Sequence, residues 1–265
     1  MPSTVRRPRA ISARRALPAC AAVALLALVP ALAAAQAPTH AYRIDGSLAD
    51  ELGGPGLVAL GGTVGPAGYT FAEGQGLSLT GALPASVYSL EMAFRLDAVN
   101  GYRKLVDFRG LADDFGFYVH DGYATFSTAG TGGAAAPQFA AHALTHLVLT
   151  RDAGGLFQAF VNGVQAMSLD DASALATFST PGAVAFLFQD DVSPFSEDPS
   201  GTVDYVRTYD RALSGAEVAA RYAAGDDAIA GVPPATSTVP EPGTWALLAT
   251  GLVAIAGVAR RARTA

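Results

Sequence analysis

The sequence predicts an all-β fold, a two-sheet antiparallel sandwich of the jelly-roll type that ends in one short helix. Short runs in which apolar and polar residues alternate recur between residues 76 and 210, and turns rich in Gly, Asp and Pro separate them. Two of these turns contain Asp121-Gly122 and Asn162-Gly163, the dipeptides that favour two-residue β-hairpins. About ten short strands with almost no helix are typical of a β-sandwich.

The alternation is clearest in YSLEMAFRLD, residues 88–97. A period of two predicts a strand with one buried and one solvated face. The apolar face would hold Leu90, Met92, Phe94 and Leu96, and the polar face Ser89, Glu91 and Arg95. The other predicted strands lie in GLSLTG (76–81), RKLVDFRG (103–110), FGFYVHDGYATFST (115–128), THLVLTRD (145–152), LFQAFVNGVQAMSL (156–169), AVAFLFQD (183–190) and GTVDYVRTYD (201–210).

One short helix is predicted in LSGAEVAARYAAGD, residues 213–226. Ser214 can cap its first turn while Glu217, three residues later, reaches back as a capping box. Gly225 supplies the stop. The side that faces the sandwich would hold Leu213, Val218 and Tyr222.

The first 35 residues are predicted to be a signal peptide. A basic start precedes the apolar stretch ALPACAAVALLALVPALAAA at residues 16–35, which ends in small residues that suit cleavage before Gln36. Cys20 is the only cysteine of the chain and lies in this leader, so the predicted mature protein forms no disulfide. The basic residues are Arg6, Arg7, Arg9, Arg14 and Arg15.

The chain closes with VPEPGTWALLATGLVAIAGVARRAR, residues 239–263. Its apolar run from Thr244 to Val258 has no polar face and holds about 15 residues, short of the roughly 20 that a bilayer requires. The arginines that follow suit a positive-inside stop, with everything upstream exported. A buried C-terminal helix is the alternative interpretation.

This order of Pro-Glu-Pro motif, apolar helix (about residues 244–259) and basic tail resembles the PEP-CTERM sorting signal, placed at residues 239–265. The resemblance implies a Gram-negative envelope protein that is held transiently in the inner membrane and processed by an exosortase. It would then reach the cell surface or the extracellular matrix. The residues that carry the resemblance are Val239, Pro240, Glu241, Pro242, Arg260, Arg261 and Arg263.

Between the two targeting segments, residues 36–227 form one predicted domain, and the Pro-containing stretch 228–240 reads as a linker. This part of the chain holds nine basic and 22 acidic residues, a net charge of −13. So acidic a module repels nucleic acid and anionic lipid, and it suits cations or neutral ligands such as sugars.

Two segments carry a family resemblance. ALTHLVLTRDAGGLFQAFVNGVQ, residues 143–165, and GTVDYVRTYDRALSGAEVAARY, residues 201–222, resemble laminin G-like, concanavalin A-type jelly rolls. The family's motifs there are W-x-H-V-A-L-T leading to Y-V-N-G, and a closing G-x-I-D-E-V-R-I-Y-N-R-A-L-S. His146 matches the structural histidine of that family, whereas Leu144 stands where the family usually has Trp.

We expect a non-catalytic surface module that binds glycan or protein in an exopolysaccharide or biofilm matrix. The alternative is a polysaccharide hydrolase or lyase, because the concanavalin A-like fold also houses glycosidases, which need two nearby carboxylates. Glu91 has no acidic partner on its own strand and E-x-D-x-x-E is absent, although partners from other strands stay open. A purely structural spacer is a third interpretation.

The first hairpin offers a ligand-binding hypothesis. If Asp121-Gly122 forms a two-residue turn, His120 faces Tyr123 and Tyr118 faces Thr125. Aromatic rings beside hydrogen-bonding groups suit sugars. The predicted ligand residues are Tyr118, His120, Tyr123 and Thr125, and the competing interpretation is an ordinary amphipathic exterior.

The acidic loop QDDVSPFSEDPSGTVD, residues 189–204, predicts a calcium site. No base interrupts the loop, calcium prefers carboxylates on flexible loops, and laminin G-like domains often hold calcium at a rim loop. The alternative is a merely solvated acidic surface. The predicted ligands are Asp190, Asp191, Glu197 and Asp198, with Asp204 on the same stretch and Asp113 and Asp114 available from another loop.

Overall fold

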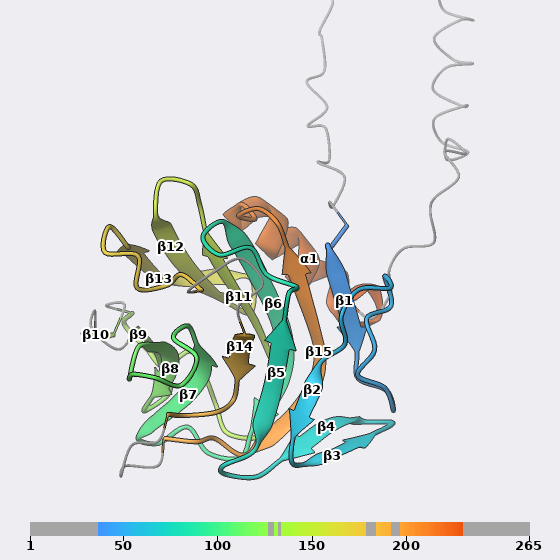
Figure 1. Ribbon diagram of the computed structural model, residues 1–265. Helices are drawn as coiled ribbons and strands as arrows, with labels where there is room; N and C mark the ends of the chain where they lie inside the picture. Colours follow the sequence, from blue (N-terminus) through green and yellow to red (C-terminus); the bar gives the residue numbers. More distant parts are fainter. Residues whose placement is uncertain (1–36, 127–129, 132–133, 179–183, 192–196, 230–265) are drawn as a thin grey trace, which may run out of the picture. The chain divides into compact units, whose positions relative to one another are not determined.

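Two antiparallel sheets lie face to face in the computed structural model, which describes residues 37–126, 130–131, 134–178, 184–191 and 197–229 (Figure 1). One sheet, here the first sheet, runs β13 (Val164–Asp170), β12 (Leu156–Val161), β11 (Thr145–Arg151), β6 (Tyr88–Leu96), β15 (Gly201–Tyr209), β4 (Gly68–Phe71) and β3 (Thr63–Gly65), and β1 (His40–Arg43) pairs with β15. The second sheet runs β10 (Gly130–Thr131), β9 (Tyr123–Phe126), β8 (Gly116–His120), β7 (Tyr102–Asp107), β14 (Val184–Leu187), β5 (Gly76–Thr80) and β2 (Val58–Leu60).

This architecture confirms the predicted all-β, jelly-roll fold. Each predicted strand is present within the described residues, whereas β1 to β4 and β10 had not been predicted. The missed strands have two to four residues each, too few to show a clear alternation. The predicted signal peptide (1–35) and sorting signal (239–265) lie outside the described residues.

Both predicted hairpins are present. Asp121 and Gly122 have φ angles of 51° and 82°, and Asn162 and Gly163 have 50° and 79°, as a type I′ turn requires. The first turn pairs His120 with Tyr123 and the strands continue to the Tyr118–Thr125 pair, so the predicted register is confirmed.

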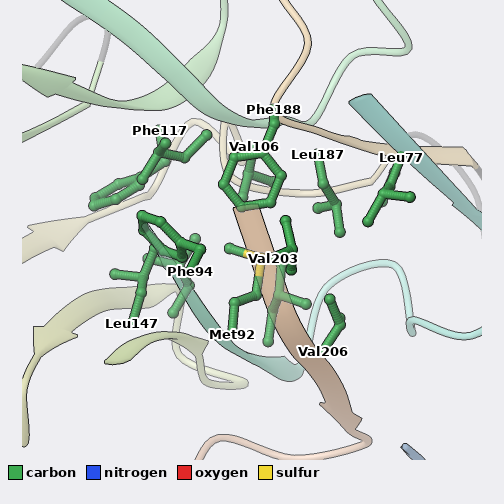
Figure 2. Packing of buried hydrophobic residues seen from close by; sticks show 14 of the residues in the cluster. Leu77, Met92, Phe94, Val106, Phe117, Leu147, Leu187, Phe188, Val203 and Val206 are labelled. Carbon is green, nitrogen blue, oxygen red and sulfur yellow. The ribbon is translucent and has the colours of Figure 1, made fainter. Parts of the chain in front are cut away.

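The core fills the space between the two sheets. Met92, Phe94 and Val203 of the first sheet meet Val106 and Phe117 of the second, and Phe188, just after β14, lies among them (Figure 2). All of these side chains are fully buried. Full burial of a side chain of this size stabilises the fold by about 1.5–3 kcal/mol.

The prediction that β6 is solvated on its polar face is wrong. Ser89 and Glu91 are fully buried, and only Arg95 on that face is partly exposed. Strand β6 is central, between β11 and β15, and the chain after β15 covers its outer face: the Ser89 hydroxyl donates to the Arg211 carbonyl and accepts from the Leu213 amide. Polar residues are tolerated there because they are hydrogen-bonded.

The helix α1 (Gly215–Ile229) lies beside the first sheet (Figure 1). The capping box is confirmed: Ser214 N donates to Glu217 Oε2 at 2.8 Å, and Glu217 N donates to Ser214 Oγ at 3.4 Å. The backbone at Gly225 is non-helical (φ 77°, ψ 175°), so the first helical segment ends there as predicted, and a second short segment continues to Ile229. The predicted apolar side holds for Leu213 and Val218, which are buried, but Tyr222 is 45% exposed.

Candidate functional site

A pocket of about 240 Å³ lies on the second sheet and is lined by Tyr102, Asp114, Tyr118 and Glu197, here called the tyrosine pocket. Tyr102 begins β7 and Tyr118 lies in β8. Phe117 and Val119 of β8 belong to the core. Because side chains alternate along a strand, Tyr118 between them lies on the outer face of the sheet. Asp114 comes from the β7–β8 loop and Glu197 from the β14–β15 loop.

The aromatic side chains of the tyrosine pocket support one another. The Tyr118 hydroxyl donates to Asp114 Oδ1 at 2.5 Å, which fixes the ring. Tyr102 meets Tyr118 edge-on at 6.0 Å between ring centroids and stacks parallel to His120 at 3.8 Å. Because Tyr102 is 43% exposed, one rigid aromatic ring is presented to solvent beside the carboxylates.

The structure separates the four ligand residues predicted on the hairpin. Tyr118 lines the tyrosine pocket but is almost fully buried, and His120 contributes by stacking on Tyr102. Thr125 is buried, and Tyr123 is half-buried beside the turn. Sequence reasoning missed Tyr102, although the register places it directly opposite His120.

Asp190, Asp191 and Glu197, described residues of the acidic stretch, lie in the same region, and a buried lysine lies beside them. Lys104 of β7 has no exposed side-chain surface, and its Nζ lies 3.2 Å from Asp107 Oδ2, 3.3 Å from Asp190 Oδ1 and 3.9 Å from Asp114 Oδ1. Carboxylate oxygens of Asp114, Asp190 and Asp191 lie within 4.8 Å of one another. The acidic stretch 189–204 contains no basic residue, but the fold places Lys104 beside Asp190.

Hydrogen bonds within the loop use the other predicted calcium ligands. Asp198 Oδ1 accepts from Asp190 N at 2.7 Å, and Asp190 Oδ2 accepts from Glu197 N at 3.2 Å. Asp204 lies outside this cluster, because a register shift between Val203 and Tyr205 directs it to Arg95, 2.8 Å away. Asp113 accepts only a local bond from Phe115 N among the bonds described.

Glu197 has the most perturbed carboxyl group of the tyrosine pocket. Burial and the nearby charges of Asp114 and Asp190 raise its pKa to about 7, and Lys104 opposes the shift only in part. Burial and the hydrogen bond to Asp114 also raise the pKa of Tyr118, far above its usual value. The tyrosine pocket therefore holds the neutral phenol of Tyr118 and a carboxyl group, that of Glu197, whose pKa lies near neutral pH.

A second polar group, here called the Glu91 network, lies under α1. Glu91 accepts hydrogen bonds from His146 Nε2, at 3.0 Å, and from the Tyr209 hydroxyl, and Arg207 and Arg221 each approach it to 3.7 Å. Burial by itself raises the pKa of Glu91, but the hydrogen bond from His146 and the two arginines lower it overall. This carboxylate stays ionised and fully buried.

A cavity of about 360 Å³ adjoins the Glu91 network, lined by Ala93, Leu144, His146, Asn162, Tyr222 and Gly225. Leu144, which stands at the position of the family's Trp, is partly buried against Ala93 and Tyr205. His146 is buried and bonded to Glu91, whereas the side chain of His142 is exposed. The two histidines thus have separate surroundings, and His146 has the structural contacts that the resemblance implies.

Comparison with known proteins identifies the family. Residues 71–219, more than half of the chain, match a laminin G-type sequence model of the concanavalin A-like lectin/glucanases superfamily. The chain belongs to this superfamily. No curated protein matches the concanavalin A-like chain.

Solved structures share the concanavalin A-like fold at low identity. Domain 4 of AbnA, an extracellular arabinanase from Geobacillus stearothermophilus solved with arabinotriose, aligns with a TM-score of 0.55 at 19% identity, over 69% of this chain and 97% of that domain. Trypanosoma rangeli sialidase in complex with sialic acid aligns with a TM-score of 0.55 at 15% identity, over 73% of this chain and 33% of the sialidase. The chain thus spans about a third of the sialidase.

Residues 238–263 match the PEP-CTERM protein-sorting motif. The match confirms the predicted sorting signal, which implies export, a membrane-anchored intermediate in a Gram-negative bacterium and processing by exosortase. The predicted sorting residues, from Val239 to Arg263, lie outside the described residues. Within the described part of the chain, no helix has the length and hydropathy needed to cross a membrane.

Proposed function

We propose that this exported protein is a non-catalytic module that binds glycan through the tyrosine pocket, on the cell surface or in the extracellular matrix. The observation that carries the proposal is the exposed ring of Tyr102 beside the carboxyl groups of Asp114 and Glu197 in one pocket. A concave site with aromatic walls and a few polar groups is the usual form of a small-ligand site.

The chemistry of the tyrosine pocket suits a neutral sugar. A pyranose or furanose ring presents C–H groups to an aromatic face, and Tyr102 offers such a face, held by its stack on His120. Sugar hydroxyl groups donate hydrogen bonds, and carboxylates such as Asp114 accept strong ones. The net charge of −13 between residues 36 and 227 disfavours an anionic polymer.

A panel of immobilised neutral oligosaccharides tests the proposal, and arabinotriose is the first to include because the similar arabinanase domain was solved with it. We expect the purified full-length protein to be retained by at least one member and to release the sugar intact on elution. Failure to bind any glycan while binding an envelope protein would replace this function with protein recognition.

Hydrolysis is a second candidate, favoured by one observation. Asp114 and Glu197 line the same pocket, and the pKa of Glu197, raised to about 7, is that of a group able to donate a proton at neutral pH. Reducing sugar that appears with the wild type but not with Glu197→Gln would establish this activity. Glu51→Gln is the matched comparison, because Glu51 lies outside the pocket and its pair with Arg43 is exposed.

A further inference from the structure

The carboxyl groups around the tyrosine pocket need a positive charge to lie so close together. Asp107, Asp114 and Asp190 all approach one point, and oxygens of Asp114 and Asp190 lie within 4.8 Å of an oxygen of Asp191. Like charges at this separation repel strongly where water is excluded, as it is around the buried Asp107 and Asp190, whereas Asp114 is largely exposed. Resemblance to laminin G-like domains implies that calcium supplies the positive charge.

The oxygens of this cluster do not fit a calcium ion. Calcium requires six to eight oxygen ligands at about 2.3–2.6 Å. Asp107 Oδ1 already accepts from the amides of Arg109 and Leu111, each at 2.9 Å, and Asp190 Oδ2 accepts from Glu197 N at 3.2 Å. The Asp114 oxygen that faces the centre accepts from the Tyr118 hydroxyl.

The centre of the cluster is taken by an ammonium group. Lys104 Nζ lies 3.2 Å from Asp107 Oδ2 and 3.3 Å from Asp190 Oδ1, the oxygens that accept none of these amide hydrogen bonds. Its distance to Asp114 Oδ1 is 3.9 Å. The ring centroid of Tyr118 lies 5.4 Å from the same nitrogen, within the range of a cation–π contact. Side-chain groups of three separate segments therefore meet at one fixed cation.

We propose that Lys104 is the resident cation of this cluster and holds Asp190 and the neighbouring Asp191 against β7 and β8 in place of a divalent metal. Its position in the middle of β7 makes the cation part of the sheet, so Asp190 reaches its position when the sandwich folds. The geometry of the tyrosine pocket, to which the loop contributes Glu197, is then independent of calcium.

The charge balance agrees with this role. Burial by itself lowers the pKa of Lys104, but Asp107 and Asp190 raise it above the ordinary value, so the ammonium form persists. An unpaired charge in this fully buried position would be strongly destabilising. The buried ammonium of Lys104 and the buried carboxylates of Asp107 and Asp190 therefore stabilise one another.

Calorimetric unfolding of the purified full-length protein, in millimolar calcium and in EDTA, is the first test. We expect the same Tm in both conditions and no heat when calcium is titrated into the folded protein. A higher Tm in calcium, accompanied by a heat of binding, would overturn the proposal, because a ligand that binds only the folded state must raise its stability.

Lys104→Met tests the charge itself, because it keeps an apolar chain of similar length. We expect it to lower Tm by about 10 °C at pH 8 and by clearly less at pH 5, since protonation then relieves the unpaired acids. The titratable groups that face the vacated position are Asp107, Asp114, Asp190, Asp191, Glu197 and Tyr118. A loss of Tm that does not depend on pH would reduce Lys104 to a packing role and sink the proposal.

Two further variants keep the test decisive. Arg95→Met is the control, because it removes an ion pair between partly exposed side chains, in which Arg95 Nη1 lies 2.8 Å from Asp204 Oδ2. This variant should change Tm by only about a degree or two. Should Lys104→Met fail to fold, Asp190→Asn removes one partner while keeping the shape, and we expect a lower Tm with no response to calcium. An Asp190→Asn protein as stable as the wild type would contradict the proposal.

Discussion

Glu91 illustrates how the fold determines the meaning of a single residue. In the sequence it is the only Glu within a clear strand and thus a candidate for catalysis, whereas the structure surrounds it with His146, Tyr209, Arg207 and Arg221. A carboxylate that is buried beside two arginines and held by hydrogen bonds is suited to joining α1, through Arg221, to the first sheet. It is poorly placed to reach a polysaccharide.

Replacement of Glu91 by Gln should therefore unfold the domain more readily, and it should leave glycan retention by the folded fraction unchanged. We expect a loss of about 3 kcal/mol in the free energy of unfolding, since the buried Arg207 and the partly buried Arg221 both lose a nearby negative charge. Urea unfolding measures it. Glu51→Gln is the matched control: its pair with Arg43, at 3.5 Å, is exposed and should be worth less than about 1 kcal/mol. Equal losses for the two variants would contradict the role given to Glu91.

Glu197 should make stability depend on pH in the opposite sense to an ordinary ion-paired acid. Its pKa rises from 4.5 to about 7 on folding, so between these values the folded state binds more protons than the unfolded state. Stability contributed by its protonated form is complete below about pH 4.5 and is lost as pH rises through 7. Glu197→Gln should flatten the fall in Tm between pH 5 and pH 7.5; an unchanged slope would show that another group titrates there.

At the scale of the elements, the sequence predicts what depends on local patterns. The strands of five or more residues and the register of the β8–β9 hairpin follow from alternation and from the turn dipeptide, and they are confirmed. The contact between Lys104 and Asp190 depends on the pairing of β7 with β14, which joins segments far apart in the chain. No local pattern contains that pairing, so the ion cluster could not be predicted.

The β12–β13 turn should be sensitive for two separable reasons. Gly163 has a φ of 79°, and a Cβ added there would lie 3.0 Å from side-chain atoms of Tyr222. Gly74 has a similar φ of 73° with nothing within 4 Å, so Gly74→Ala measures backbone strain alone, about 1–2 kcal/mol. We expect Gly163→Ala to cost measurably more than Gly74→Ala in chemical unfolding. The same cost for both would mean that Tyr222 moves aside freely.

In the whole molecule, positive charge is concentrated near the two ends and negative charge between them. The part between residues 36 and 227 has a net charge of −13, whereas the predicted signal peptide and the C-terminal tail hold eight arginines between them. The sorting motif at residues 238–263 implies that the concanavalin A-like domain is exported.

Mass spectrometry of the protein recovered from an exosortase-bearing host tests this delivery. We expect a mature chain that lacks residues 1–35 and the tail after the Pro-Glu-Pro motif, found in the envelope or the culture fluid. Recovery of an intact chain from the cytoplasm, with both ends present, would contradict the account of export.

The central claim, that the tyrosine pocket binds glycan, is tested most directly by titration calorimetry with the oligosaccharide that the panel identifies. Tyr102 and Tyr222 are matched tyrosines, 43% and 45% exposed, of which only Tyr102 lines the pocket. We predict that Tyr102→Ala weakens binding at least about tenfold, a cost of about 1.4 kcal/mol, while Tyr222→Ala leaves the affinity unchanged. Equal affinities for wild type and Tyr102→Ala would contradict the claim and place the glycan elsewhere on the domain.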